Sequence, residues 1–483
     1  MIIMDSESLN GKNITELPES MKKLYEQARE LIENNDDIKI YTHIDCDGLC
    51  SGAILSEILD RLGKEHEIQW VNLDELQDLE IKNQLTIFSD LGSGQPVDKN
   101  ANENQSIIIL DHHPPLRDLD YNANCNYLEI NPIHHGIDGS YYVCGGGLCY
   151  FLGKEFGYED LSWIGVLSAI GDMQNSRTGK LEGLNTTIVN DAKKNGLLEI
   201  EENDLNLYGR KTNPLFVSLS RFSDVKLPIT NNQGRAKKIL KDLEIDGTVP
   251  LSKVTYEEKG KIFQELFKEI MEIVPSKYIP FVPKLLMSDS YEFLNENKEE
   301  FLSDASEFST SMNACGRNEE YETAHKVLKG NRQEALDSLE GISKEHKRNL
   351  AKSIERVAKR TDEGMDDGGI IELDNIQYFD GYGIPANIVG TVTGMILGEG
   401  NWKKPMIGLS QTDEDNIKVS LRCSKLLSYD EKAHFGHIIR EISQSVGGNG
   451  GGHAVACGAY IPVDKRNEFI ENFNQRLEGI IEK

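Results

Sequence analysis

Acidic and imidazole side chains follow several apolar segments of this sequence, in a pattern that could bind divalent metal ions. The run "IIILDHH" at 107–113 ends in three such residues, and three other apolar segments end in the same way. The candidate ligands are His43, Asp45, Asp47, Asp90, Asp111, His112, His113 and Asp172. Carboxylate oxygens with one or two imidazoles suit Mn²⁺ or Mg²⁺ better than a soft metal. Two such ions, about 3.5–4 Å apart, could clamp a phosphate and activate water.

The order of the surrounding segments explains how these side chains could meet. Apolar stretches at 38–45, 68–72, 85–90, 106–111 and 127–132 predict strands. The spacing at 49–64 predicts a helix, and 145–157 and 160–172 predict consecutive buried helices. Strands that are apolar along their length and alternate with helices indicate an α/β fold with a parallel sheet covered on both faces. The carboxyl ends of parallel strands share one edge, where ligands bind, so we expect the candidate ligands to converge there.

Each candidate ligand also has a simpler interpretation. An isolated Asp after a strand is usually a helix cap or a loop residue, and Asp90 alone favours the cap. Capping and metal binding are about equally favoured for Asp45 and Asp47, which a glycine follows. Asp111, His112 and His113 after four aliphatic residues favour a metal site. Four apolar segments that all end in acidic or imidazole residues are difficult to explain as helix caps alone. Carboxylates that meet at one edge of a sheet also repel one another unless a cation lies between them.

Length and composition limit the class of protein. The chain has 483 residues, enough for two or three domains, and its 38% hydrophobic and 27% charged content predicts a soluble globular protein. No apolar run is long enough to span a bilayer, so no membrane partner is expected. The net charge of −28 excludes binding of nucleic acid through a general basic field. The eight cysteines lack a C-x-x-C pair and predict reduced thiols in a cytoplasmic protein.

The remainder of the chain divides by its pattern. We predict a catalytic domain at 1–200, beginning with a helix within 1–35, and a helical extension at 201–345. The polar stretch 334–364 predicts a connecting helix without a core, which places a linker at 346–367. A smaller α/β domain follows at 368–483, with a helix at 385–398, strands at 404–411 and 416–423, and a helix near 431–445.

A glycine-rich segment, "GGNGGGH" at 447–453, could bind an anion. Glycine permits close approach of the main chain, and successive amides of Gly450, Gly451 and Gly452 would form an anion-binding loop. A flexible loop is the alternative, although His453 and the strand predicted after it favour a fixed one. Arg317, Asn387 and Arg422 are further candidates for contacts with substrate. An exposed Arg is usually only a solvated charge, and Asn387 could equally cap a helix.

Six short motifs resemble those of the DHH phosphoesterase superfamily. "HIDCDG", "SDLG", "DHHPP" and "IGD" occur in the order of its four motifs. "SMNACGR" at 311–317 is similar to an element of RecJ-type nucleases, and "GGNGGGH" is similar to the signature of the DHH-associated domain. The resemblance covers nearly the whole chain and is greatest to archaeal RecJ-like exonucleases of the GINS-associated type.

The resemblance implies roles for individual residues. It implies that Asp45, Asp47, Asp90, His112 and Asp172 hold two ions, with Asp90 between them. His43 is either a further ligand or a structural partner of its loop. Asp111 would orient His112. His113 would contact the phosphate or give a proton to the leaving oxygen. Arg317, Arg422 and His453 would hold substrate phosphates.

The resemblance also implies an activity: hydrolysis of phosphodiesters in single-stranded nucleic acid, with 5′→3′ degradation of DNA favoured, in replication or repair. One alternative is a phosphodiesterase for short oligonucleotides or cyclic dinucleotides. Another is a replication factor with little catalysis. The helical extension could bind GINS or the replicative helicase, or could be ordinary helical bulk, and both interpretations stay open.

Overall fold

The computed structural model describes residues 13–73, 75–298, 300–330, 333–362, 368–381, 383–428 and 434–480. Within these residues the chain forms two compact units. The first unit takes in the chain up to Asn203 together with Ser288–Ser343, and the second takes in Asp204–Met287 with the chain from Lys344 onwards. The predicted helical extension, 201–345, is therefore divided between the two units.

A five-stranded parallel sheet is the centre of the first unit, with strand order β2-β1-β3-β4-β5. Its strands are β1 (Ile38–Thr42), β2 (His66–Trp70), β3 (Leu85–Ser89), β4 (Ser106–Leu110) and β5 (Asn126–Ile130). The helices of this unit are α1 (Glu19–Glu33), α2 (Cys46–Arg61), α3 (Gly145–Glu155), α4 (Ser162–Gly171), α5 (Asn185–Lys194), α10 (Ala305–Arg317) and α11 (Tyr321–Leu328). The predicted α/β fold with a parallel sheet is confirmed. Residues 1–12 of the predicted leading helix lie outside the described residues.

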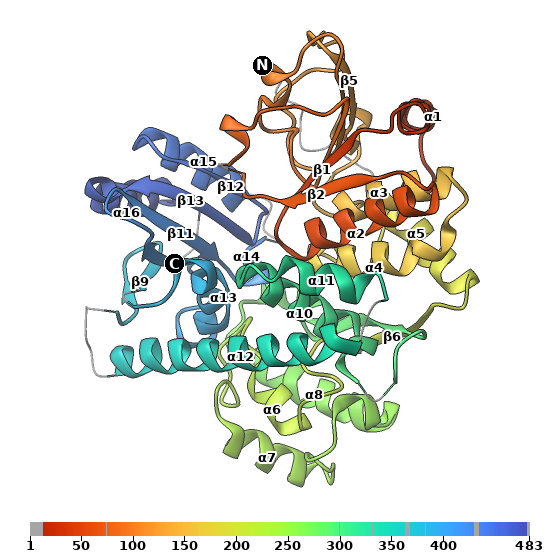
Figure 1. Cartoon of the computed structure of the whole chain (residues 1–483). Coiled ribbons are helices and arrows are strands. Elements are labelled where there is room, and N and C mark those ends of the chain that lie inside the picture. The colour runs from red at the N-terminus through yellow and green to blue at the C-terminus, as the bar shows by residue number, and fades with distance from the viewer. Residues whose placement is uncertain are drawn as a thin grey trace. The chain divides into compact units, whose positions relative to one another are not determined.

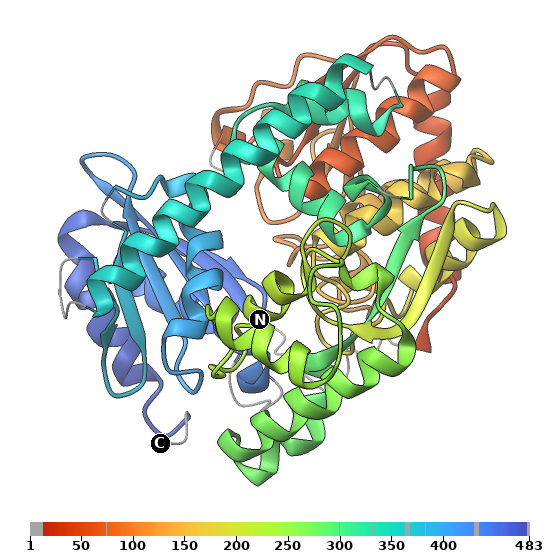
Figure 2. The ribbon, with the colours of Figure 1, turned by 90° about the horizontal axis from the view of Figure 1, so that it is seen from below.

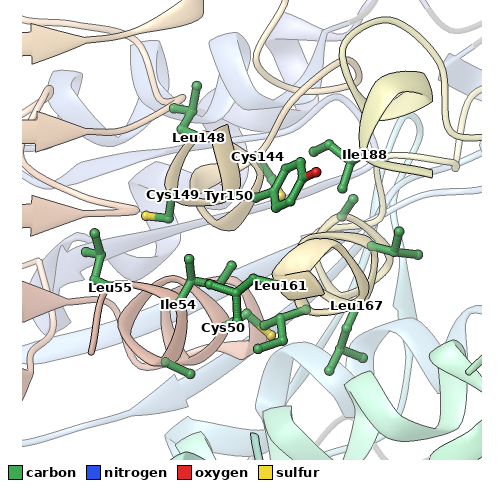
Figure 3. Packing of buried hydrophobic residues seen from close by; sticks show 14 of the residues in the cluster. Cys50, Ile54, Leu55, Cys144, Leu148, Cys149, Tyr150, Leu161, Leu167 and Ile188 are labelled. Carbon is green, nitrogen blue, oxygen red and sulfur yellow. The ribbon is translucent and has the colours of Figure 1, made fainter. Parts of the chain in front are cut away.

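Buried helices cover the sheet of the first unit. Helix α2 packs beside α3 and α4, and both α2 and α3 contact strands of the sheet (Figure 1). Figure 3 shows side chains of α2, α3 and α4 meeting in one apolar cluster, with Ile54, Tyr150 and Leu167 among them. These three side chains are fully buried. Burial of this kind is worth about 1.5–3 kcal/mol for each large apolar side chain, so the cluster fixes the helices that begin or end beside the sheet edge.

The second unit is built on a six-stranded mixed sheet, with strand order β12-β13-β11-β10-β9-β8. Its strands are β8 (Ile371–Glu372), β9 (Gln377–Asp380), β10 (Met406–Gln411), β11 (Asn416–Arg422), β12 (Asn449–Gly452) and β13 (Ala456–Pro462). The helices that follow α12 (Gln333–Asp362) are α13 (Ala386–Ile396), α14 (Lys425–Ser428), α15 (Phe435–Ser445) and α16 (Arg466–Arg476). The helix predicted near 431–445 begins at Phe435, and residues 431–433 lie outside the described residues.

The segment 204–287 forms helices with a core of their own, which also takes in two buried residues from elsewhere in the second unit. These helices are α6 (Leu215–Ser220), α7 (Gln233–Asp242), α8 (Tyr256–Ile273) and α9 (Val282–Leu286). Trp402 and Leu426 are buried in the same cluster as Leu219 and Leu266. Strands β6 (Leu198–Leu205) and β7 (Met287–Phe293), which the helical interpretation of this region did not predict, pair in a two-stranded sheet where the chain passes between the units.

Helix α12 (Gln333–Asp362) is a continuous helix that Figure 2 shows along its length. The prediction of a helix here agrees with the structure, but the prediction that it lacks a core is wrong. Leu339 is buried in the main cluster of the first unit, while Leu350 and Val357 are buried against α13 in the second. Most of the surface of α12 is polar, so its few apolar residues were not recognised in the sequence as a buried stripe.

Two further features bear on the class of protein. None of the helices in the described part of the chain is long and apolar enough to cross a membrane. All eight cysteines lie among the described residues as free thiols, and seven of them are buried.

Candidate metal centre

Three neighbouring strands of the parallel sheet end at the same level. Thr42 of β1 pairs with Ser89 of β3, and Ser89 pairs with Leu110 of β4. The chain continues from these strand ends into three loops that carry the predicted ligands: His43, Asp45 and Asp47 after β1, Asp90 after β3, and Asp111, His112 and His113 after β4. Asp172 follows the last residue of α4. The parallel pairing therefore gathers ligands that are far apart in the sequence.

The first loop turns directly into helix α2. Asp45 caps this helix, and its Oδ1 accepts a hydrogen bond from the Gly48 amide at 3.0 Å. Capping, which the sequence left as an alternative to metal binding, uses only Oδ1, whereas Asp45 Oδ2 lies 3.2 Å from His43 Nδ1 among the candidate ligand atoms. Gly48 is required at its position, since a Cβ there would overlap the His43 carbonyl. This contact fixes the distance between β1 and α2.

Asp47 is buried in the first turn of α2 and is held by the start of another helix. The amides of Gly145 and Gly146, at the beginning of α3, donate to its two carboxylate oxygens at 2.8 and 2.7 Å. Ser168 Oγ also donates to Oδ1. A helix N-terminus favours a negative charge, so α3 stabilises this carboxylate in a buried place. A Cβ at Gly146 would overlap Ser168 Oγ.

Asp90 is the central carboxylate of the cluster. Its φ of 58° lies in the left-handed region, which Asp and Asn adopt more readily than other residues with a side chain. Its side chain is 1% exposed, and within the described residues neither carboxylate oxygen accepts a hydrogen bond. The nearest imidazole nitrogens are His112 Nε2 at 3.3 Å and His43 Nδ1 at 3.4 Å. A buried carboxylate without a donor is costly, and a bound cation would satisfy both oxygens.

His112 is oriented by the main chain. Its Nδ1 lies 2.8 Å from the Gly139 carbonyl and therefore donates to it, which leaves Nε2 as the ligand nitrogen. Nε2 lies 3.5 Å from Asp47 Oδ2, in addition to its approach to Asp90. Gln174 donates to the Gly139 carbonyl at 2.7 Å and to Asp172 Oδ2 at 2.9 Å, so it connects both ligands. Gln174 could not be predicted from the sequence, because an Asp-x-Gln sequence is not a motif and is equally compatible with an ordinary loop.

The prediction that Asp111 orients His112 is wrong. Asp111 Oδ1 accepts hydrogen bonds from His113, from Nδ1 at 2.8 Å and from the amide at 3.1 Å. Oδ2 accepts from the Ser93 amide at 2.9 Å. The Gly139 carbonyl takes the place at His112 that was expected for Asp111. Asp111 therefore holds His113, whose side chain is 40% exposed and whose ring centre lies 4.3 Å from that of His112.

The electrostatics of the cluster show an excess of buried negative charge. Burial, with repulsion from Asp47 and Asp45, raises the pKa of Asp90 well above its usual range. Burial acts to lower the pKa of His112, but Asp172, Asp90 and Asp47 outweigh it and raise that pKa well above its usual range. Burial likewise raises the pKa of Asp47 against the attraction of His112. A divalent cation would relieve this repulsion.

Within the described residues the ligand atoms fall into three overlapping groups, each with its atoms within 4.8 Å of one another. The groups are His43, Asp45 and Asp90; Asp47, His112 and Asp172; and Asp90, Asp111, His112 and His113. Asp90 and His112 each belong to two groups. The donor set consists of carboxylates and imidazoles, which fits Mn²⁺ or Mg²⁺.

The NACGR element supports this site in a way that the sequence did not reveal. Asn313 of α10 accepts a hydrogen bond from the Cys46 amide through Oδ1 at 3.0 Å. A Cβ at Gly316 would overlap the Ile44 carbonyl, so α10 lies directly against the loop that carries the first ligands. Arg317, the predicted substrate residue of this element, is the last residue of α10. Asn313 and Gly316 are thus residues of the motif that lie against the loop of the first candidate ligands.

The remaining predicted substrate residues belong to the second unit. Arg422 ends β11, and its guanidinium lies beside Gly390 and Gly394 of α13, the helix that also carries Asn387. Burial lowers the pKa of Arg422, and its Nη1 donates to its neighbour's carbonyl, Leu421 O, at 2.8 Å. Among the described residues no carboxylate forms an ion pair with Arg422.

The expected anion-binding loop at 447–453 is wrong in its conformation. Gly450, Gly451 and Gly452 lie in β12, which pairs antiparallel with β13. His453 follows β12, and its amide donates to Ala456 O at 3.0 Å. The glycines have a packing reason, because a Cβ at Gly450 would lie 2.8 Å from Ser443 Oγ of α15 and 2.7 Å from the Cβ of Ala459 in β13. The helix and the edge strand approach each other too closely for side chains between them.

The comparisons with known proteins agree with this fold and site. Residues 37–166 match the N-terminal domain of the DHH family, and residues 374–479 match the DHHA1 domain. The chain is 30% identical over 463 residues to the uncharacterized protein MJ0831 of Methanocaldococcus jannaschii, with 94% of this chain and 96% of that protein aligned. The chain therefore belongs to the DHH family of phosphoesterases.

Two solved structures have a similar fold. CDC45 from Entamoeba histolytica has a TM-score of 0.59 at 16% identity, over 94% of this chain and 98% of that one. RecJ from Thermus thermophilus, in complex with Mn²⁺, has a TM-score of 0.53 at 14% identity, over 97% of this chain and 56% of that one. This chain thus corresponds to about half of that RecJ. The predicted resemblance to RecJ-like proteins is confirmed for the fold.

Proposed function

We propose that this protein is a metal-dependent phosphodiesterase that degrades single-stranded nucleic acid from an end. The observation that carries the proposal is Asp90, a buried carboxylate to which none of the described residues donates a hydrogen bond and which is shared by two groups of candidate ligands. Two Mn²⁺ or Mg²⁺ ions would supply electrostatic stabilisation of the phosphate and an activated water. We assign the ions to two sets that share Asp90: His43 with Asp45, and Asp47 with His112 and Asp172.

The side chains around the ions have separate tasks in this proposal. The main-chain contacts of Asp47 and His112 hold the ligands in a fixed geometry, so that little reorganisation is needed when substrate binds. His113 is half-exposed at the edge of the cluster, and Asp111 fixes its ring. His113 is therefore placed to contact the scissile phosphate or to give a proton to the leaving oxygen. Polarity is proposed as 5′→3′ on DNA.

Arg422 of the second unit, which forms no ion pair with a carboxylate of the described residues, supports a polyanionic substrate. The Arg422 guanidinium is desolvated, and a phosphate would supply the charge that no carboxylate of the described residues provides. We propose that Arg422, with Asn387, His453 and the main chain of β12, binds substrate phosphates. Arg317 is proposed for the same task. In a chain with net charge −28, such local contacts replace a general basic field.

An end-labelling assay tests this proposal. Pure protein with Mn²⁺ is incubated with single-stranded DNA and with single-stranded RNA, labelled in separate samples at the 5′ end or the 3′ end. Duplexes of the same sequences are tested in parallel. Early release of a labelled mononucleotide from the 5′ end of single-stranded DNA supports the proposed activity. Asp90→Asn should abolish it, while Asp120→Asn, the same change at an exposed position, should not. Cleavage of cyclic dinucleotides alone would favour the alternative phosphodiesterase.

The similarity to CDC45 over 98% of that chain favours one second candidate, a replication factor with little catalysis. Partners such as GINS and the replicative helicase would then bind the protein without hydrolysis. The filled ligand positions favour an active site over this alternative. Binding of purified GINS by a protein that releases no nucleotide in Mn²⁺ would decide for the replication factor.

A further inference from the structure

A buried ion pair lies beside the candidate metal centre without belonging to it. Arg117 and Asp98 each have a side chain that is 4% exposed. Asp98 follows the loop that begins with Asp90, and Arg117 lies in the loop that begins with Asp111 and carries His112. Neither residue is a candidate ligand, and burial of this pair requires a reason beyond its charge, because an apolar pair of the same size would be at least as stable.

The Arg117 guanidinium binds the Asp90 loop at several points. Its Nε donates to Asp98 Oδ1 at 2.9 Å, and its Nη2 also contacts this carboxylate. Nη2 donates to Gln95 O at 2.7 Å, and Nη1 lies 3.3 Å from Gly92 O. Tyr121 donates through its hydroxyl to Asp98 Oδ2 at 2.5 Å. Arg117 Nη1 also donates to Ser93 O at 3.4 Å, so the guanidinium connects a carboxylate and three carbonyls, which a Lys ammonium cannot do in the same plane.

Further hydrogen bonds connect the same loops close to the ligands. The Leu116 amide donates to Ser93 O at 2.7 Å, and the Ser93 amide donates to Asp111. Asn131, after β5, donates to Ser93 Oγ at 3.0 Å and to His113 O at 2.8 Å. Gly92 and Ser93 are two and three residues after Asp90, so a displacement of this loop moves the central carboxylate.

We propose that Arg117 is a positioning residue that holds the Asp90 loop and the His112–His113 loop at the separation needed for joint metal binding. This inference rests on the proposed function. Asp90 Oδ1 and His112 Nε2, 3.3 Å apart, come from the two loops that Arg117 joins. Ligands on separate loops bind an ion tightly only when their separation is fixed before binding. Arg117 supplies this constraint from outside the cluster.

The test compares Arg117→Lys with Arg210→Lys. Arg210 is a matched control because it forms another buried ion pair, with Asp204 at 2.7 Å, in the second unit. The affinity for Mn²⁺ is measured by titration calorimetry, thermal unfolding is measured without metal, and kcat and KM are measured on single-stranded DNA. We expect both variants to unfold at lower temperature. Only Arg117→Lys should weaken Mn²⁺ binding, by on the order of 10-fold, with kcat lowered more than KM is changed at subsaturating metal.

Several outcomes would overturn the inference. Unchanged Mn²⁺ affinity in folded Arg117→Lys would do so, as would equal weakening in Arg210→Lys, which would indicate a general loss of stability. If Arg117→Lys does not fold, Asp98→Asn replaces it, because this variant keeps the guanidinium but loses the charge of its partner. We expect the Mn²⁺ affinity of Asp98→Asn to decrease, by less than the roughly 10-fold expected for Arg117→Lys. An unchanged Mn²⁺ affinity in Asp98→Asn would refute the role of Arg117. A wild-type protein that binds no Mn²⁺ would instead refute the proposed function, together with the role derived from it.

Discussion

Replacement of Asp90 by Asn should stabilise the metal-free protein. Asn has the shape of Asp and also tolerates the left-handed φ of 58°, which Ala would not. The change removes a buried carboxylate that accepts no hydrogen bond in the described structure and that Asp47 and Asp45 repel. Leaving a buried polar group unsatisfied costs about 1–3 kcal/mol, and more when it is charged. The neutral amide of Asn avoids the part of this cost that the charge adds, so we expect the free energy of unfolding at neutral pH to rise by on the order of 1 kcal/mol.

The sign of the pH dependence follows from the raised pKa of Asp90. In the unfolded chain Asp ionises near pH 4, whereas in the folded metal-free protein it stays protonated to higher pH. The wild-type protein therefore loses stability as the pH rises through the folded pKa, and the Asn variant does not. The advantage of Asp90→Asn should be small near pH 4 and should grow towards neutral pH.

Thermal unfolding with and without Mn²⁺ measures both effects. A gain of 1 kcal/mol raises Tm by about 2–4 °C in a domain of this size. Metal at 100 times its Kd should stabilise the wild-type protein by about 2.7 kcal/mol, and the variant by much less. The order of the two proteins should therefore reverse: Asp90→Asn melts higher without metal and lower with it.

Asp111→Asn is the matched comparison, because Asp111 is also buried but accepts three hydrogen bonds from Ser93 and His113. This variant should be destabilised without metal. The reasoning fails if metal-free Asp90→Asn melts below the wild-type protein, or if both Asn variants change stability in the same direction.

Other variants test separate parts of the structure. Gly146→Ala should cost about 1–3 kcal/mol of stability and weaken Mn²⁺ binding, because the added methyl group displaces Ser168 from Asp47; melting curves and calorimetry measure both. Arg422→Lys should raise KM for single-stranded DNA while Mn²⁺ affinity stays the same, since the change removes the proposed phosphate contact and no candidate metal ligand. Steady-state kinetics at saturating Mn²⁺ measure this, and a decrease in kcat alone would contradict it. Burial lowers the pKa of His325 to about 4, so this ring is neutral in the fold and protonates on unfolding below about pH 6.5. Stability should then fall by about 1–2 kcal/mol from pH 7 to pH 5, and less in His325→Phe, as urea unfolding at the two pH values would show.

The sheet of the first unit could be predicted from the sequence because its strands are short, apolar along their length and separated by helices. Five of them lie within a few residues of the predicted positions. Their parallel pairing then required that His43, Asp90 and His112 converge at the strand ends, although these residues are far apart in the sequence. The positions of the candidate ligands followed from topology alone; whether these residues bind ions stays a prediction.

Contacts that depend on main-chain geometry could not be predicted. Asp111 precedes both histidines, and only the turn after β4 decides that it binds His113 while a carbonyl binds His112. The glycines of β12 suggested a loop because glycine has low strand propensity, whereas close packing against both α15 and β13 is what requires Gly450, and packing against β13 requires Gly452. Asn313 and Gln174 had no pattern of their own, since each makes its contact across the fold.

The contact between α3 and Asp47 has a consequence for the choice of ion. The Asp47 carboxylate is held by two main-chain amides, and Gly146 has no room for a methyl group. The candidate ligands around Asp47 therefore cannot move apart easily. Ca²⁺ needs oxygen ligands at about 2.3–2.6 Å and a larger coordination number, whereas Mg²⁺ needs about 2.0–2.1 Å. A metal site of fixed size should therefore discriminate between ions by their radius. Ca²⁺ should compete poorly with Mg²⁺ or Mn²⁺ for this site, even when Ca²⁺ is abundant.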